Sequence, residues 1–237
     1  MQHVRAIPCG RPESTGDPLR SPWQLALIID ETERDICMKL TSNNQQNTAE
    51  QIAINELIAG SDVLRQTALH LAPAIVTVAE QMINVLRAGG KILICGNGGS
   101  AADAQHFAAE LVGRFRRQRP GWSAIALTVD ASVLTSLGND YGFEQIFARQ
   151  VQALGRAGDI LVAISTSGRS QNVLAAVEVA AALGMQTVGL TGAGISQLGQ
   201  VVDHHLPIPS ANTAFIQQGQ MAVIHVLCEL VEERLTS

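Results

Sequence analysis

The sequence predicts an α/β fold: a three-layer αβα sandwich around a five-stranded parallel sheet, preceded by N-terminal helices. Two observations lead to this prediction. Short apolar segments alternate with helical patterns along most of the chain, and strands that are apolar on both faces are typical of parallel sheets covered by helices. The length of 237 residues and the hydrophobic share of 46% suit one domain with a sizeable core plus an accessory segment.

The expected elements follow one another in a regular order. Apolar residues at helical spacing from about residue 48 predict one or two helices, with a break at Gly60-Ser61 and an end at Gly89-Gly90. Five strands are expected at residues 91–95, 124–129, 160–165, 187–190 and 205–208. Helices are expected from residue 101 onward, over 143–154 and 172–183, and after 213 as far as 233. Ligands of such sheets bind beyond the carboxyl ends of the strands, so the loops there form the candidate site.

The first 37 residues differ from the rest, because four prolines interrupt them and little of the segment is apolar. We expect residues 1–47 to be a flexible or mis-assigned leader, with Met38 as an alternative start. An ordered N-terminal strand is the other possibility. Residues 48–237, including N-terminal helices over 48–89, are expected to form the functional domain.

The composition argues against several classes of function. A net charge of −5 and an aromatic share of 3% offer neither the basic surface nor the stacking side chains of a nucleic-acid-binding protein. The four cysteines, Cys9, Cys37, Cys95 and Cys228, are scattered, which suits reduced thiols in the cytoplasm better than a disulfide framework. The sequence has no uninterrupted apolar run of about 18 residues, so we expect no membrane span.

Two strand-to-helix loops have the composition of ligand-binding loops. Ser165-Thr166-Ser167-Gly168-Arg169-Ser170 offers hydroxyls and amides at a helix N-terminus, which could bind a phosphate or simply cap the helix. It lacks the lysine of a P-loop, so NTP hydrolysis is not indicated. Gly96-Asn97-Gly98-Gly99-Ser100 would let a sugar approach the backbone closely. Because residue 101 is alanine, this loop does not complete a dinucleotide-binding fingerprint.

Three ionisable residues are candidates for proton transfer. His106 and Glu110 are four residues apart on the helix after the glycine loop, so they share one face. A solvated salt bridge is the ordinary explanation of such a pair. His225 lies in the apolar last helix, where a histidine is more often part of the core. An imidazole that titrates near neutrality would also suit proton transfer.

Several motifs in order resemble the signature of the bacterial phosphoheptose isomerases, a branch of the SIS (sugar isomerase) family. They are Cys95 to Ser100 with Asp103, His106, Glu110 and Arg114; Gly138 to Phe143; Ile164 to Gly168; and Ile216-Gln217 with His225. The resemblance covers about residues 50 to 235 and implies a flavodoxin-like sheet. It also implies interconversion of sedoheptulose 7-phosphate and D-glycero-D-manno-heptose 7-phosphate by a homotetramer with interfacial active sites.

The resemblance assigns roles to individual residues. Glu110 corresponds to the general base and His225 to the general acid. Zinc, which some members bind, would be held by His106, Glu110, Gln217 and His225. The residues that match substrate contacts are Asn97, Gly98, Ser100, Arg114, Asn139, Asp140, Ser165, Thr166, Ser167, Ser170 and Gln217. Gln217 and His225 are eight residues apart, about 12 Å along a helix, so either Gln217 precedes the helix or the site combines subunits.

The sequence departs from the family pattern at four positions and leaves two rival functions open. Phe215, Gln218, Gln220 and Arg169 replace the usual Arg, Glu, His and Asn, which bears on substrate identity and metal affinity. One rival is a non-catalytic SIS tetramer that binds a replication initiator, but such proteins lack the carboxylate and imidazole found at Glu110 and His225. The other is an isomerase for a different phosphosugar, such as a hexosamine 6-phosphate.

Overall fold

The computed structural model describes residues 48–236. By its internal contacts the chain separates into two units, residues 1–50 and 51–237. The predictions for residues 1–47 concern residues that lie outside the described part. The sheet lies entirely in the second unit.

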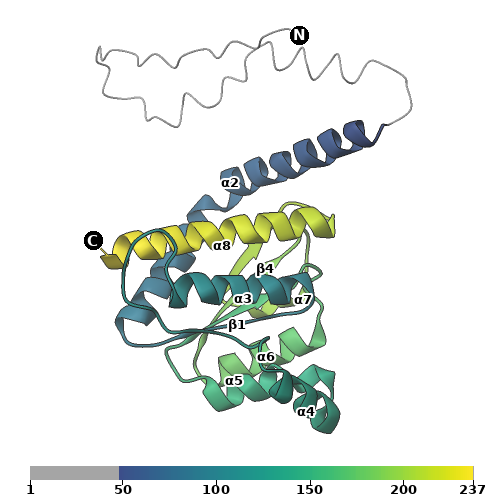
Figure 1. Cartoon of the computed structure of the whole chain (residues 1–237). Coiled ribbons are helices and arrows are strands. Elements are labelled where there is room, and N and C mark those ends of the chain that lie inside the picture. Colours follow the sequence, from purple (N-terminus) through teal and green to yellow (C-terminus); the bar gives the residue numbers. More distant parts are fainter. Residues whose placement is uncertain (1–47, 237) are drawn as a thin grey trace. The chain divides into compact units, whose positions relative to one another are not determined.

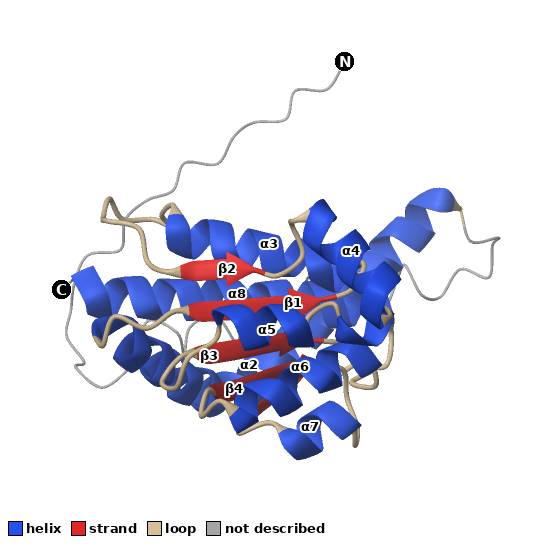
Figure 2. Cartoon of the chain, turned by 90° about the horizontal axis from the view of Figure 1, so that it is seen from below, coloured by secondary structure: helices blue, strands red, loops and turns tan. Residues whose placement is uncertain are grey.

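Five strands form one fully parallel sheet, as predicted: β1 (Ile92–Gly96), β2 (Ala124–Ala126), β3 (Ile160–Ile164), β4 (Gln186–Thr191) and β5 (His204–Pro207). Their spatial order is β2-β1-β3-β4-β5 (Figure 2), the flavodoxin-like order. The strand order reverses between β1 and β3, where a crevice opens for a ligand in sheets of this type. The glycine loop follows β1 and the Ser-Thr loop follows β3, so both expected loops flank this point.

Helices cover both faces of the sheet and complete the three-layer sandwich (Figure 1). Successive strand side chains point to opposite faces, so Ile92 and Ile94 join one apolar cluster while Leu93 and Cys95 join the other. The first cluster is covered by α2 (Ala49–Arg87), α3 (Gly99–Val112) and α8 (Thr213–Thr236). The second is covered by α4 (Ala131–Tyr141), α5 (Ala148–Leu154), α6 (Gln171–Ala182) and α7 (Gln197–Val201). The short 3₁₀ helix η2 (Phe143–Gln145) lies between α4 and α5 in the chain.

The expected helix break at Gly60-Ser61 is wrong, because α2 runs without interruption from Ala49 to Arg87. Gly60 is buried inside this helix, and the space that a side chain would fill is taken by the amide of Gln218 on α8. The glycine therefore serves close packing of two helices rather than a turn. The predicted stop is confirmed, since α2 ends two residues before Gly89.

Two helices, α4 and α7, were not predicted. Asp130 caps α4 by accepting a hydrogen bond from the backbone N–H of Val133 at 2.9 Å. The helix ends at Gly142, whose φ is 87°. The single helix expected over residues 143–154 is instead the short η2 followed by α5.

Two of the described helices, α2 and α8, are long and apolar enough to cross a membrane by length and composition alone. Core helices of soluble proteins meet the same criterion. Both helices contribute side chains to the apolar cluster against the sheet, α2 through Val78 and Met82 and α8 through Ile224 and Leu227.

Candidate active site

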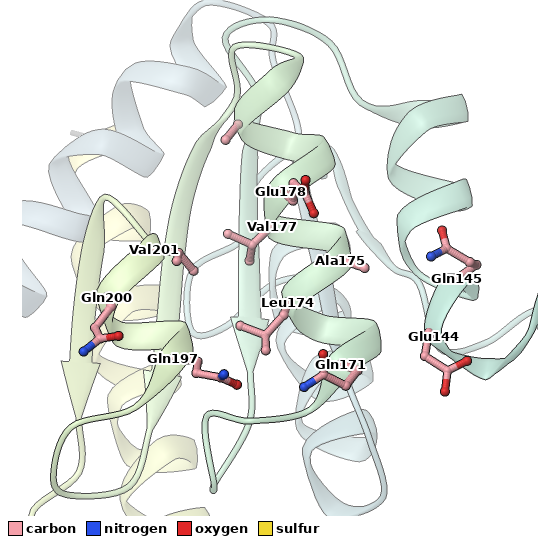
Figure 3. A pocket seen from close by; sticks show the side chains of 11 residues that line it. Glu144, Gln145, Gln171, Leu174, Ala175, Val177, Glu178, Gln197, Gln200 and Val201 are labelled. Atoms are coloured by element: carbon pink, nitrogen blue, oxygen red, sulfur yellow. The ribbon is translucent and has the colours of Figure 1, made fainter.

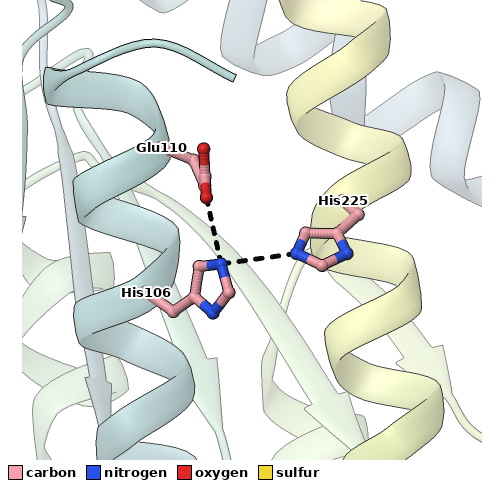
Figure 4. A group of neighbouring side chains, drawn as sticks. All are labelled: His106, Glu110 and His225. Atoms are coloured by element: carbon pink, nitrogen blue, oxygen red, sulfur yellow. Dashed lines mark hydrogen bonds and ion pairs between the residues drawn. The ribbon is translucent and has the colours of Figure 1, made fainter. Parts of the chain in front are cut away.

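His106, Glu110 and His225 converge between α3 and α8 (Figure 4). The Nε2 atom of His106 lies 3.0 Å from Oε1 of Glu110 and 3.4 Å from Nε2 of His225. The His106 and Glu110 side chains are 43% and 22% exposed. The helical spacing of His106 and Glu110 was predicted, and the packing of α3 on α8 adds the second imidazole.

This arrangement fits neither ordinary explanation well. His225 is only partly buried and faces the His106 ring, with centroids 5.1 Å apart, so it is not enclosed in the core. The contact between His106 and Glu110 is present, but a third ionisable group is added to it. The cluster combines a carboxylate with two imidazoles, the residue types that carry most proton transfers in enzymes.

The same three residues have the donor set of a metal site. Their ligand atoms all lie within 4.8 Å of one another. A tetrahedral zinc ion with bonds of about 2.0–2.2 Å needs ligand atoms roughly 3.4 Å apart, close to the separations of 3.0 and 3.4 Å found here. Two Nε2 atoms that face each other need either a proton on one of them or a cation between them. The residues therefore fit zinc.

The loops after β1 and β3 lie side by side and are held together by two asparagines. The side chains of Asn97 and Asn172 donate to each other, at 2.8 and 2.9 Å. Asn172 is 3% exposed, in the first turn of α6. Asn97 was predicted as a substrate contact, whereas Asn172 was not predicted. Nothing in its sequence context distinguishes it from any other polar residue at a helix start.

The Ser-Thr loop has the backbone of a tight binding loop. Gly168 has a φ of 59°, and a side chain there would clash with Ser196 and Thr191. Ser170 is at the N-cap of α6, but its side chain makes no capping bond. Its Oγ atom instead lies 3.1 Å from Oγ of Ser165. The hydroxyls of these two serines are thus directed toward one another at the sheet edge.

The other predicted site residues lie in several places. Gln217 is inside α8, and its amide lies against Gly99 at the start of α3, so the idea that Gln217 precedes the helix is wrong. Asn139 and Asp140 are on α4, where the amide of Asn139 donates to Asp140 at 2.7 Å. Ser100 is buried at the start of α3, and Arg114 is exposed after its end.

Asp103 is a further ionisable group near the cluster. It lies one turn before His106 on α3, and its Oδ2 atom is buried without a hydrogen-bond partner. Burial raises the pKa of Asp103, and the neighbouring His106 opposes that rise.

A small pocket lies beside the cluster. A pocket of about 200 Å³ lies beside His225, between Phe115, Arg116 and Glu229. A larger groove of about 630 Å³ runs along α6 between Glu144 and Gln200 (Figure 3). None of the predicted site residues lines that groove. Sites for small molecules usually occupy about 300–1,000 Å³, so the pocket beside His225 is too small to enclose a sugar phosphate by itself.

Comparisons with known proteins agree with this geometry. The chain matches the family model described as SIS domain over residues 58–192. A phosphoheptose isomerase from Roseiflexus sp. (strain RS-1) is 53% identical over 193 residues, which cover 81% of this chain and 98% of the relative. Another, from Geobacter sulfurreducens, is 51% identical over 180 residues, which cover 76% of this chain and 95% of the relative.

Solved structures give the same result. A phosphoheptose isomerase from Neisseria gonorrhoeae is similar with a TM-score of 0.75 at 42% identity, covering 78% of this chain and all of that one (100%). A second, from Francisella tularensis, has a TM-score of 0.76 at 42% identity, covering 78% of this chain and 99% of that one. The resemblance found in the motifs is confirmed: this chain belongs to the phosphoheptose isomerases of the SIS domain family.

Proposed function

We propose that this protein interconverts sedoheptulose 7-phosphate and D-glycero-D-manno-heptose 7-phosphate. The observation that carries the proposal is the convergence of Glu110 and His225, in a chain 53% identical to a phosphoheptose isomerase. The reaction moves one proton between C1 and C2 through an enediol and a second proton between the oxygens on those carbons.

Each group has a chemical role suited to its type. The Glu110 carboxylate takes the proton from one carbon and returns it to the other on the same face of the sugar. The His225 imidazole exchanges the proton between the two oxygens. The hydroxyls and amides of residues 165–170 bind the phosphate at the N-terminus of α6. Asn97, Gly98, Ser100, Asn139 and Asp140 bind the sugar hydroxyls.

Zinc would be held by His106, Glu110 and His225. When bound it would polarise the sugar carbonyl and stabilise the negative charge that develops on its oxygen. Gln217 of the same copy is about 12 Å along α8 from His225, so as a fourth ligand it would come from another copy. Metal analysis of protein purified without chelator or affinity tag tests the assignment. Protein without stoichiometric zinc would withdraw it.

A homotetramer with interfacial active sites would explain why the glycine loop and Glu110 lie far apart within one chain. Ser100 and Glu110 lie ten residues apart on the rigid helix α3, roughly 15 Å along its axis. The glycine loop of one copy is therefore distant from the Glu110 of that copy. Apolar side chains on α2 also lack cover, with Leu57, Leu64 and Leu69 exposed by 73%, 39% and 63%, which suits burial against other copies.

The proposed enzyme acts on a free phosphosugar in the cytoplasm. Support comes from the acidic net charge of −5, and from Cys95 and Cys228, which are free, buried thiols. A non-catalytic tetramer that binds a replication initiator is the less favoured interpretation, because such a role has no need of the Glu110–His225 pair.

The test is an isomerase assay with a panel of ketose phosphates that contains sedoheptulose 7-phosphate, ribulose 5-phosphate and fructose 6-phosphate. We expect an aldose product from the seven-carbon sugar, and we expect Glu110→Gln to lower turnover on the order of 10²- to 10⁴-fold. Glu178→Gln, which alters a carboxylate on α6 away from the cluster, is the matched control. Activity on another sugar alone would redirect the substrate assignment, and an undiminished rate in Glu110→Gln would remove Glu110 as the base.

A further inference from the structure

The segment that leaves α3 is attached to α8 by two glutamates. This segment, residues 113–119, contains four arginines and is called the arginine loop. Arg116 and Arg117 each form an ion pair with Glu229 at 3.1 Å. Glu232, one turn further along α8, accepts hydrogen bonds from backbone N–H groups of the loop.

Glu232 is fully buried, at 0% exposure, and its carboxylate accepts four hydrogen bonds. The backbone N–H groups of Phe115, Arg116 and Arg117 donate to it at 3.0, 2.7 and 2.8 Å. The Nε–H of Arg119 donates at 3.0 Å. Burial alone would raise the pKa of Glu232, but these hydrogen bonds outweigh it and the net pKa is lowered. A charged carboxylate therefore fixes the backbone of the arginine loop.

Arg119 connects this carboxylate to the end of α3. The last carbonyls of a helix have no partner within it. Here the Arg119 guanidinium donates to the carbonyl oxygens of Glu110 at 2.8 Å, Leu111 at 2.9 Å and Gly113 at 3.2 Å. Its side chain is 2% exposed and lies 3.5 Å from the centre of the Trp122 ring. Arg119 thus holds the backbone of Glu110 itself.

The arginine loop also contacts the other member of the acid–base pair. The Phe115 ring stacks on the His225 ring, with centroids 5.5 Å apart and an interplanar angle of 29°. Phe115 is also one of the residues whose N–H is bound by Glu232. A single buried carboxylate therefore controls both the end of α3 that bears Glu110 and the ring that packs on His225.

We propose that Arg119 and Glu232 are positioning residues for the Glu110–His225 pair, a role that rests on the proposed function of that pair. They set the separation between α3 and α8 at the height of the cluster. Neither side chain contacts the cluster, since the Glu232 carboxylate binds the arginine loop and the Arg119 guanidinium binds Glu232 and the end of α3. Misplacing reacting groups by about 1 Å can cost on the order of 10²-fold in rate. A small shift of the contacts made by Arg119 and Glu232, together called the clamp, is therefore enough to lower turnover.

A second buried carboxylate, which contacts neither α3 nor α8 in the hydrogen bonds found, provides a matched control. Asp159 is 3% exposed. It accepts from the backbone N–H groups of Lys91 and Arg156 at 2.9 Å each, and from the Lys91 ammonium at 2.6 Å. Lys91 and Asp159 precede β1 and β3, whereas the ligand loops follow those strands. Asp159→Asn damages a similar network whose donors, Lys91 and Arg156, belong to neither α3, α8 nor the arginine loop.

The experiment compares Glu232→Gln, Arg119→Lys and Asp159→Asn in full-length protein, measuring kcat, KM, the melting temperature and the crystal structure. We expect all three to lower the melting temperature, but only the first two to lower kcat, by about 10- to 100-fold, with KM changed less than about threefold. Lysine keeps the charge of Arg119 but has a single nitrogen, so it cannot bind Glu232 and the helix carbonyls together. If Glu232→Gln does not fold, Arg119→Lys decides alone.

The crystal structures separate this proposal from the proposed function. We expect the His106–His225 separation, 3.4 Å between Nε2 atoms here, to change in Glu232→Gln and Arg119→Lys but not in Asp159→Asn. An unchanged cluster, or a kcat loss in Asp159→Asn equal to that in Glu232→Gln, would overturn the positioning role. Wild-type protein that does not isomerise sedoheptulose 7-phosphate would defeat the proposed function instead, and the cluster geometry would still decide the role of the clamp.

Discussion

The reciprocal amide pair between Asn97 and Asn172 offers a quantitative test of how the two ligand loops are coupled. Each hydrogen bond in such a pair contributes about 1 kcal/mol to stability, and a buried polar group left without its partner costs about 1–3 kcal/mol. The two residues differ in burial: Asn172 is 3% exposed, whereas Asn97 is partly open to solvent. Replacing Asn97 and replacing Asn172 should therefore lower the free energy of unfolding by different amounts.

Asn97→Ala removes both bonds and leaves the buried Asn172 amide without a partner. We expect it to lower the free energy of unfolding by about 2–3 kcal/mol. Asn172→Ala leaves Asn97 able to bind water, so we expect a loss of about 2 kcal/mol. The double variant should lose about 3 kcal/mol rather than the sum, which gives a coupling energy of about 1–2 kcal/mol.

Urea unfolding at one fixed protein concentration measures these values, since the proposed assembly would make the apparent stability depend on concentration. The KM for the sugar phosphate should rise in each single variant, because either change uncouples the glycine loop from the Ser-Thr loop. Strict additivity of the two substitutions would refute the reasoning. So would a greater loss of stability in Asn172→Ala than in Asn97→Ala.

The surroundings of single residues give three further predictions. His225→Asn should lower kcat far more than the melting temperature. The control His205→Asn, which breaks a 2.8 Å contact with Thr191, should lower the melting temperature and leave kcat unchanged. Equal losses of kcat and melting temperature in His225→Asn would support a purely structural role. Because the pKa of Glu232 is lowered in the folded protein, the charged carboxylate stabilises the fold fully above the ordinary pKa of 4.5, and this stabilisation is lost as the pH falls through the folded-state pKa. Urea titrations from about pH 7 to about pH 3 should therefore show a shrinking difference in stability between wild type and Glu232→Gln, and a constant difference would contradict this prediction. Burial raises the pKa of Cys95 and Cys228 to about 12, so mass spectrometry after iodoacetamide treatment should find both unlabelled until the protein is unfolded, and rapid labelling of either in native protein would contradict their burial.

The sheet could be predicted because its central strands β1 and β3 are continuous apolar runs that alternate with helical patterns. All five expected strands exist, and none of their ends differs from the expected residue by more than three. The helix break at Gly60 failed for a tertiary reason: whether a glycine turns the chain or admits a neighbour depends on Gln218, more than 150 residues away in sequence. The sequence around Gly60 contains no information about that contact.

The site divides in the same way. The spacing of His106 and Glu110 on one helix is a local property and was predicted correctly. The approach of His225 depends on the packing of α3 on α8, and only the family resemblance indicated it. Glu232 and Arg119 were missed because a glutamate and an arginine 113 residues apart look like solvated surface charges until the fold buries them together.

The rigidity of α3 has a consequence for experiments on mixed oligomers. A straight helix keeps Ser100 and Glu110 about 15 Å apart, so in the proposed interfacial site these two residues of one copy would contact different sugars. Two inactive preparations, one altered at Ser100 and the other at Glu110, should then regain turnover when they are dissociated, mixed and reassembled. Each hybrid interface of the right orientation would draw its intact glycine loop from one parent and its intact carboxylate from the other.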